Sequence, residues 1–427
     1  MKHTVIEVRL KNGAKGLFIN IPDASVMSVE INFRAGEYLV EKDKWETPHL
    51  MEHILLGANE RYTKARIFQA EIERNGAYSN ASTGVYDITY DAECADFEWQ
   101  RIVDLMLLAI SKPLFLGEEF DAEVGNVREE LTARSNNHFR HLSLALREHY
   151  GFMAKTDQER LKLMDKVQLE DVRRHYERTH TTKNMRFVIA GKLTPTRRSE
   201  LLTMLEGIEL PRGDIRLALP DEKPVHRTEP VYIHNETVKN VYFYIDSFMK
   251  RRMKDSESDA LGLVNTMLTE TMYSKILGTA RERGLVYGMS SGYGQTKLSS
   301  NWWFGAQVSR KNVGELFDII IYELQNVFNG EIAVTDIEAA KAYSLGRFQR
   351  SAQTVSGTAG GYSGRYFFDE VVEDYYQVPQ RIAAINKEGM VDISKALFKD
   401  QVWGLGILSN CDKAFATDLQ KRIADLW

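Results

Sequence analysis

Alternating apolar and polar residues predict strands at matching places in the two halves of the chain. The segment SVMSVEINFRAG, residues 25–36, alternates and leads into a helical stretch, and TVKNVYFYIDSF, residues 237–248, does the same in the second half. Alternation of this kind is typical of a strand buried on one face. Near its end, each half also has a β-rich run followed by a helical pattern; the runs are residues 184–191 and 402–409, and the helical patterns are residues 197–208 and 413–427.

Prolines mark the boundary between the halves. Four of the chain's 9 prolines fall between residues 208 and 230. Because proline fixes φ and lacks a backbone donor, this segment is typical of an extended linker. We therefore expect an α+β fold of two similar domains, each a mainly antiparallel sheet with helices packed on one face. The expected parts are an N-terminal domain at residues 1–210, a linker at 211–230 and a homologous C-terminal domain at 231–427.

Composition supports two ordinary globular domains. The chain has 427 residues, of which 43% are hydrophobic and 27% are charged, and this length exceeds that of a typical single core. A net charge of -5 gives no basic surface for a phosphate backbone, so we expect no nucleic-acid partner. Two cysteines, Cys94 and Cys411, cannot build a disulfide framework. No apolar run approaches the roughly 20 residues that span a bilayer, and the N-terminus has no export signal. We expect a cytoplasmic protein with no membrane partner.

The stretch TPHLMEHILLG, residues 47–57, is a candidate metal site. We expect a helix that begins with Thr47 as its cap. His49 and His53 are four residues apart and so share a helix face, where two imidazoles can hold one tetrahedral ion. Glu52 projects from nearly the same side, close enough to reach a metal-bound water. The alternative is an amphipathic helix whose histidines border its apolar stripe by chance.

A zinc site needs a third protein ligand on another element. Residues 120–139 have an acidic and helical pattern in which Glu123 and Glu130 both flank the apolar Val127. Glu129 points to the opposite side. Glu130 is therefore the preferred ligand, and Glu123 suits a place behind the ligands, where it would orient one of them. The alternative is a solvated acidic helix with no metal.

Together these segments resemble a known family. Residues 33–84 and the following acidic helix are similar to the N-terminal domain of pitrilysin-type zinc peptidases, the inverzincins, whose motif is His-x-x-Glu-His with a distal glutamate nearly eighty residues later. The resemblance implies zinc bound by His49, His53 and Glu130. It implies that Glu52 is the general base, and a second family glutamate falls on Glu123.

The resemblance also covers substrate-binding segments. SNAST, residues 79–83, is similar to the family's edge strand, so an extended peptide is expected beside Asn80 and Ala81. RERGLVYGM, residues 281–289, is similar to the second-domain signature and supplies Tyr287, which would assist the oxyanion. The chain departs from the signature where the family has an arginine, because that position is an alanine and Arg281 stands one residue later.

The expected function is therefore zinc-dependent hydrolysis of peptides or unstructured segments. In the second half, residues 259–268 have neither histidine nor glutamate, so only the first domain is expected to bind metal. Because long family members carry four such domains and this chain has two, the resemblance implies a dimer, either with a second copy or with a related chain. The alternative is a non-catalytic or partner-dependent subunit of a processing-peptidase-like heterodimer. The glycine-rich segment 356–366 has no lysine in phosphate-loop spacing, and we expect a flexible turn or domain contact there.

Overall fold

The computed structural model describes residues 1–399 and 402–426, which form two compact units. Unit 1 comprises Met1–Thr132, Gln158–Pro220 and Gln349–Tyr375; unit 2 comprises Ala133–Asp157, Asp221–Phe348 and Tyr376–Trp427. Residues 207–230 contain no helix or strand, as the prolines predict. The domain boundaries at residues 210 and 230 stay a prediction.

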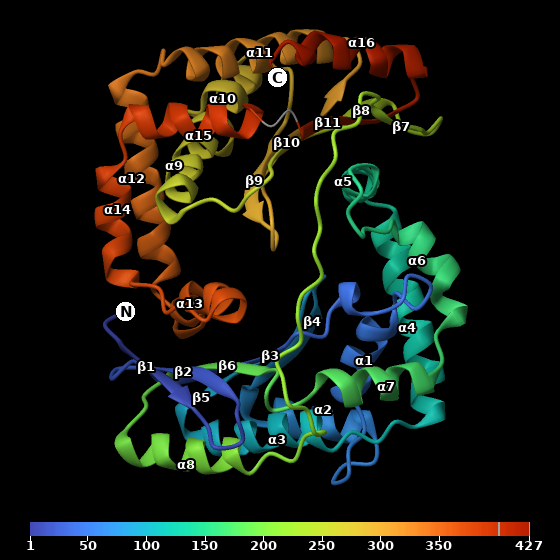
Figure 1. Ribbon diagram of the computed structural model, residues 1–427, viewed down its shortest axis with the longest axis vertical. Helices are drawn as coiled ribbons and strands as arrows, with labels where there is room; N and C mark the ends of the chain where they lie inside the picture. Colours follow the sequence, from blue (N-terminus) through green and yellow to red (C-terminus); the bar gives the residue numbers. More distant parts are fainter. Residues whose placement is uncertain (400–401, 427) are drawn as a thin grey trace. The chain divides into compact units, whose positions relative to one another are not determined.

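Unit 1 is built on a six-stranded sheet with the order β1-β2-β6-β3-β5-β4 (Figure 1). Its strands are β1 (Thr4–Arg9), β2 (Lys15–Asn20), β3 (Val26–Phe33), β4 (Tyr78–Thr83), β5 (Ile88–Ala95) and β6 (Met185–Gly191). All neighbours pair antiparallel except β2 and β6, which are parallel. The order leaves β4 at an edge, with hydrogen bonds to β5 on one side.

Helices bury one face of this sheet. On β3 the side chains of Met27, Val29, Ile31 and Phe33 alternate into the core and are at most 1% exposed. They pack in one cluster with apolar side chains of the helices that follow. The helices of unit 1 are α1 (Thr47–Leu55), α2 (Ala65–Glu73), α3 (Trp99–Ser111), most of α4 (Gly117–Ser135), most of α6 (Asp157–Leu163), α7 (Leu169–Thr179), α8 (Pro195–Glu206) and α13 (Val355–Asp369).

Helix α13 lies on the opposite face of the same sheet and contacts β6 and β3. Its Ser363 hydroxyl donates to Glu30, whose side chain points away from the apolar face of β3. The expected turn at residues 356–366 is therefore wrong, because this glycine-rich segment is helical. Gly361 permits close packing, since a Cβ atom there would lie 2.7 Å from the Tyr375 ring.

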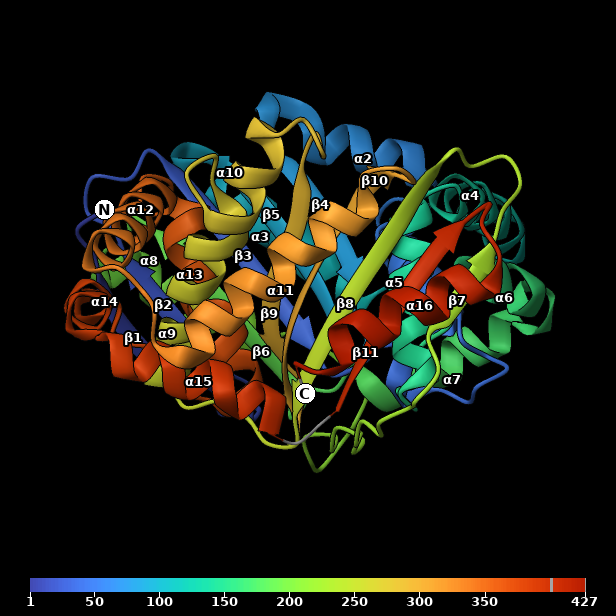
Figure 2. The same ribbon diagram turned by 90° about the horizontal axis from the view of Figure 1, so that it is seen from above.

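Unit 2 repeats the plan with a five-stranded sheet of order β7-β11-β8-β10-β9. Its strands are β7 (Val231–His234), β8 (Asn240–Met249), β9 (Met289–Gln295), β10 (Ser300–Ser309) and β11 (Val402–Ser409). Among its described strands, β7 and β11 pair in parallel and the other neighbours pair antiparallel. The helices are α5 (His138–His149), α9 (Asp255–Asn265), α10 (Lys275–Glu282), α11 (Val313–Asn329), most of α12 (Val334–Ser351), α14 (Val378–Ala384), α15 (Lys387–Lys399) and α16 (Lys413–Ala424) (Figure 2).

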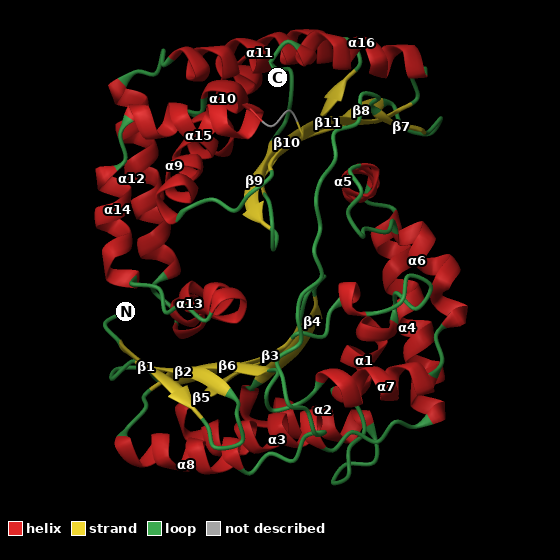
Figure 3. Ribbon diagram, viewed as in Figure 1, coloured by secondary structure: helices red, strands yellow, loops and turns green. Residues whose placement is uncertain are grey.

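The two faces of the second sheet are also covered differently. Phe243 and Ile245 of β8 pack with α11 and α15 in the larger core, whereas Tyr244 and Phe248 of the same strand pack with α5. Each unit is therefore a mainly antiparallel sheet with a main helical layer, and the expected fold class is confirmed (Figure 3).

Most predicted elements are present with small changes. The four predicted strands correspond to β3, β8, β6 and β11, and the helical patterns after them to α8 and α16. Trp427, at the end of the last pattern, lies outside the described residues. The expected helix at residues 120–139 is wrong in its extent, because it breaks at Asn136 and Asn137 into α4 and α5, and the Asn137 side chain caps α5. Within the described ranges, no helix combines the length and apolar character needed to cross a bilayer.

Candidate metal centre and active site

Helices α1 and α4 bring the predicted metal ligands together. His49 Nε2 lies 3.2 Å from Glu130 Oε2, and His53 Nε2 lies 3.7 Å from the same oxygen. One ligand atom from each of the three residues can be chosen so that all lie within 4.8 Å of one another. Val127 is fully buried and Glu129 is exposed, so the helical phase that favoured Glu130 is the one observed.

A buried carboxylate that the sequence analysis missed lies behind His49. Glu46, at the cap position of α1 in place of the expected Thr47, accepts a hydrogen bond from His49 Nδ1 at 3.1 Å. Arg160 of α6 donates to both Glu46 oxygens, at 2.6 and 2.9 Å. An acid three residues before His49 is visible in the sequence and could have indicated this contact. Nothing in the sequence indicates that Arg160, 114 residues after Glu46, lies beside it.

Glu123 has the corresponding place behind His53. Its Oε2 lies 2.8 Å from His53 Nδ1 and accepts a second hydrogen bond from Asn126 at 3.1 Å. Glu123 thus contacts His53 and lies outside the group of His49, His53 and Glu130 that could hold a metal. Its orienting role stays a prediction.

The surrounding carboxylates set the protonation of this site. Burial lowers the pKa of His53, but hydrogen bonds with Glu123 and Glu130 outweigh burial and raise it to about 9. Burial also lowers the pKa of His49, but hydrogen bonds to Glu130 and Glu46 outweigh burial and raise this pKa above its usual value. Burial raises the pKa of Glu46, yet the bonds from His49 and Arg160 prevail and bring it to about 2. A metal ion that binds here therefore competes with a proton on His53.

Glu52 is tied to the edge strand. Its Oε2 accepts a hydrogen bond of 2.5 Å from the Thr83 hydroxyl at the end of β4. The same strand carries Asn80, which is exposed, and Ala81, which is buried. The structure thus places the candidate base beside the strand where the sequence predicts the substrate. The Thr83 contact was not predicted.

Arg281 and Tyr287 are both in unit 2 and contact each other. The Arg281 guanidinium donates to the Tyr287 carbonyl and lies 4.9 Å from the centre of its ring. The Tyr287 side chain is 89% exposed and lines a cavity of about 740 Å³ next to β9 and β10. Ser309 lines the same cavity, and its buried hydroxyl has no hydrogen-bond partner among the residues that the structure describes.

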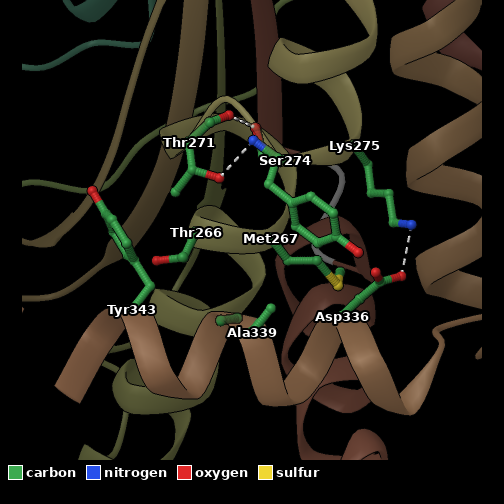
Figure 4. A pocket seen from close by; sticks show the side chains of 10 residues that line it. Thr266, Met267, Thr271, Ser274, Lys275, Asp336, Ala339 and Tyr343 are labelled. Carbon is green, nitrogen blue, oxygen red and sulfur yellow. Dashed lines mark hydrogen bonds and ion pairs between the residues drawn. The ribbon is translucent and has the colours of Figure 1, made fainter. Parts of the chain in front are cut away.

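A second cavity of unit 2, of about 300 Å³, lies between α12 and the π-helical turn Thr266–Glu270 (Figure 4). Its walls include Met267 and Tyr343, and the ion pair of Lys275 with Asp336, 2.7 Å long, lies at one end. None of the predicted site residues lines it.

The donor set of α1 and α4 fits zinc. Two imidazole nitrogens and one carboxylate oxygen are the protein ligands typical of a catalytic zinc site, which keeps its fourth position open. Each histidine also has a carboxylate at its other ring nitrogen, as zinc-binding histidines usually do.

Comparison with protein families identifies the chain. Residues 17–160 match the family described as Insulinase (Peptidase family M16), and residues 166–343 match the Peptidase M16 inactive domain. The two matches cover most of the sequence, and the chain belongs to peptidase family M16, in a short two-domain form. The resemblance to pitrilysin-type peptidases is thereby confirmed. A comparison with curated proteins gave no match.

Solved structures share the fold along nearly the whole chain. A protease from Helicobacter pylori has a TM-score of 0.84 at 17% identity, covering 95% of this chain and 100% of the other. The peptidase M16 inactive domain from Pseudomonas fluorescens has a TM-score of 0.81 at 14% identity, covering 96% and 98%. A chain of complex III2 from Candida albicans has a TM-score of 0.77 at 13% identity, covering 98% and 100%. At these identities the similarity shows the fold alone.

Proposed function

We propose that the protein is a zinc metalloendopeptidase that hydrolyses peptides or unstructured polypeptide segments. The observation that carries this proposal is the convergence of His49, His53 and Glu130, with Glu52 on the same helix as the two histidines. The surrounding carboxylates orient both histidines, as a metal centre requires.

Each residue of the candidate site has a separate role in the proposed peptide hydrolysis. His49, His53 and Glu130 would hold zinc, which supplies a Lewis acid for the attacking water and the peptide carbonyl. Glu52 removes a proton from that water and returns it to the departing amine nitrogen. The Thr83 hydroxyl holds one Glu52 oxygen, which leaves the other to carry the proton.

Recognition of the substrate rests on an exposed sheet edge. Within the described part of the chain, strand β4 has a strand partner on one side only, so a peptide can add as a further strand beside Asn80 and Ala81. Such binding uses main-chain hydrogen bonds, tolerates varied sequences and requires an unfolded segment. In unit 2, the exposed Tyr287 and the cation of Arg281 are suited to contact a peptide carbonyl or carboxylate.

The second candidate is a non-catalytic or partner-dependent subunit. It is favoured by the match of residues 166–343 to the Peptidase M16 inactive domain and by the shift that places Arg281 one position late. The intact motif of His49, Glu52 and His53 argues for catalysis. Metal content together with hydrolysis of a quenched peptide distinguishes the two candidates.

We propose a catalytic domain at residues 1–210, a linker at 211–230 and a metal-free homologous domain at 231–427, in a cytoplasmic protein. The proposed assembly is a dimer, with a second copy or a related chain, because an uncovered edge such as β4 invites wrong pairing. A dimer mass for the purified chain in light scattering supports a homodimer. A fully active monomer contradicts the dimer.

The proposed function is tested with the purified chain and a quenched, unstructured peptide. Chelation should abolish cleavage and added zinc should restore it. Cleavage that continues after complete metal removal contradicts the proposal, as does a zinc-loaded protein that cleaves none of a varied peptide set.

A further inference from the structure

Glu46 and Arg160 form a buried ion pair directly behind one of the proposed ligands. The side chain of Glu46 is 0% exposed and that of Arg160 is 6% exposed. Arg160 Nε donates to Glu46 Oε1 at 2.6 Å and Arg160 Nη2 donates to Glu46 Oε2 at 2.9 Å, which is the two-pronged geometry of a strong guanidinium-carboxylate contact. Glu46 Oε2 also accepts a hydrogen bond from His49 Nδ1, at 3.1 Å.

This arrangement fixes which nitrogen of His49 carries a proton. An ionised carboxylate only accepts hydrogen bonds, so Nδ1 must be the protonated nitrogen. The other nitrogen, Nε2, lies 3.2 Å from a Glu130 oxygen and is the one that offers its lone pair to a metal when no proton occupies it. Rotation of the His49 ring would break the bond to Glu46, which is itself held in place by Arg160.

The two histidines are not held alike. Glu123, which contacts His53, is 20% exposed and has an amide partner, Asn126, rather than a buried cation. Arg160 also contacts a second acid, Glu37, at 3.0 Å. Glu46 contacts both Arg160 and His49 and so joins the two side chains directly.

We propose that Glu46, held by Arg160, is a positioning residue that presents Nε2 of His49 to the metal and thereby sets the zinc affinity of the site. The proposal rests on the proposed function, because it takes His49 as a zinc ligand. It assigns a role to two residues that lie outside the motif and do not touch the metal themselves.

The test is the zinc affinity of the full-length chain, measured at neutral pH by competition with a chelating dye. Glu46→Gln should weaken zinc binding by about 10–100-fold, the usual cost of losing a carboxylate behind a histidine ligand. Glu37→Gln is the matched control, since it removes a second acid that Arg160 contacts and leaves the acids in contact with His49, Glu46 and Glu130, unchanged. It should leave the zinc affinity unchanged.

A double variant separates positioning from folding. Arg160→Met alone leaves Glu46 buried without its cation and should lower the melting temperature of the metal-free protein. Adding Glu46→Gln removes that charge, so the double variant should regain much of the melting temperature while its zinc affinity stays low. If Glu46→Gln alone does not fold, this double variant carries the test.

Three results would overturn the proposal: unchanged zinc affinity in Glu46→Gln, an equal loss in Glu37→Gln, or recovery of both affinity and stability in the double variant. A wild-type chain that binds zinc without cleaving peptides contradicts the proposed function and leaves the comparison of Glu46 with Glu37 valid. A wild-type chain that binds no zinc overturns both.

Discussion

Replacing Glu370 by glutamine is expected to loosen helix α13 from the sheet of unit 1. Glu370 follows the last residue of α13 and adopts a left-handed backbone with φ of 55°. Its carboxylate lies 2.5 Å from Lys15 Nζ, 3.0 Å from Arg186 Nε and 3.1 Å from Arg216 Nη1. These three cations belong to β2, β6 and the segment after α8, so a single carboxylate joins the helix to the sheet.

The magnitude follows from the charges around Glu370. Burial raises its pKa, but the bonds from Lys15 and Arg186 prevail and lower it from 4.5 to about 2. At about 1.36 kcal/mol per pKa unit, this lowering of the pKa limits the contribution of the Glu370 charge to stability to about 3 kcal/mol. Burial, followed by the nearby guanidinium groups of Arg186 and Arg34, lowers the pKa of Arg216 to about 9, so the Glu370 carboxylate offsets repulsion among these cations. The Glu370 side chain is also 26% exposed, so screening by water reduces the expected loss to about 2 kcal/mol.

The dependence on pH has a definite sign. Because the folded-state pKa of Glu370 is lowered, its contribution is fully present above 4.5 and is lost as the pH falls toward about 2. The stability difference between wild type and Glu370→Gln should therefore be constant near neutral pH and shrink in acid.

The assay is hydrogen exchange of the α13 and β6 amides, because a chain of two units need not unfold in one step. Glu370→Gln should lower the opening free energy of α13 by about 2 kcal/mol. Glu200→Gln, the same change at an exposed position of α8, is the control and should have no effect. Unchanged protection of α13 in Glu370→Gln would refute the reasoning.

Two further predictions concern the candidate site. Glu130→Gln should strip most of the zinc, whereas Glu129→Gln should retain it, since Glu129 is exposed; metal analysis showing the reverse would mean that the ligand is misassigned. Arg281→Ala should raise KM because a fixed cation is lost, and Tyr287→Phe should lower kcat. Steady-state kinetics that are unchanged in both variants would favour a second domain with no part in catalysis.

Local patterns predicted much of the arrangement of the candidate metal centre. His49 and His53 come together because residues four apart share a helix face, and Glu130 follows from its phase relative to the buried Val127. Both arguments need only the geometry of one helix. The convergence of α1 with α4 came from the family resemblance, because no local pattern tells how two helices pack.

Long-range partners could not be predicted in the same way. Arg160 reaches Glu46 across 114 residues and Thr83 reaches Glu52 across 31, and neither pair has a periodic signal. The helix α13 was missed because glycine has a low helix propensity, and here close packing against Tyr375 outweighs that cost. The break before α5 depends on the Asn137 cap, which a periodicity argument does not weigh.

The most direct test of the proposed function compares wild type with Glu52→Gln in zinc content and in hydrolysis of a quenched, unstructured peptide. Glu52 lies on α1 between the two histidines and contacts Thr83 rather than a ligand, so its loss should leave the metal in place. We predict equal zinc content and a fall in kcat of about 10²–10⁴-fold, the usual cost of removing a general base. Near-normal hydrolysis by a zinc-loaded Glu52→Gln protein would contradict the assignment of Glu52 as the base and, with it, the mechanism proposed for this chain.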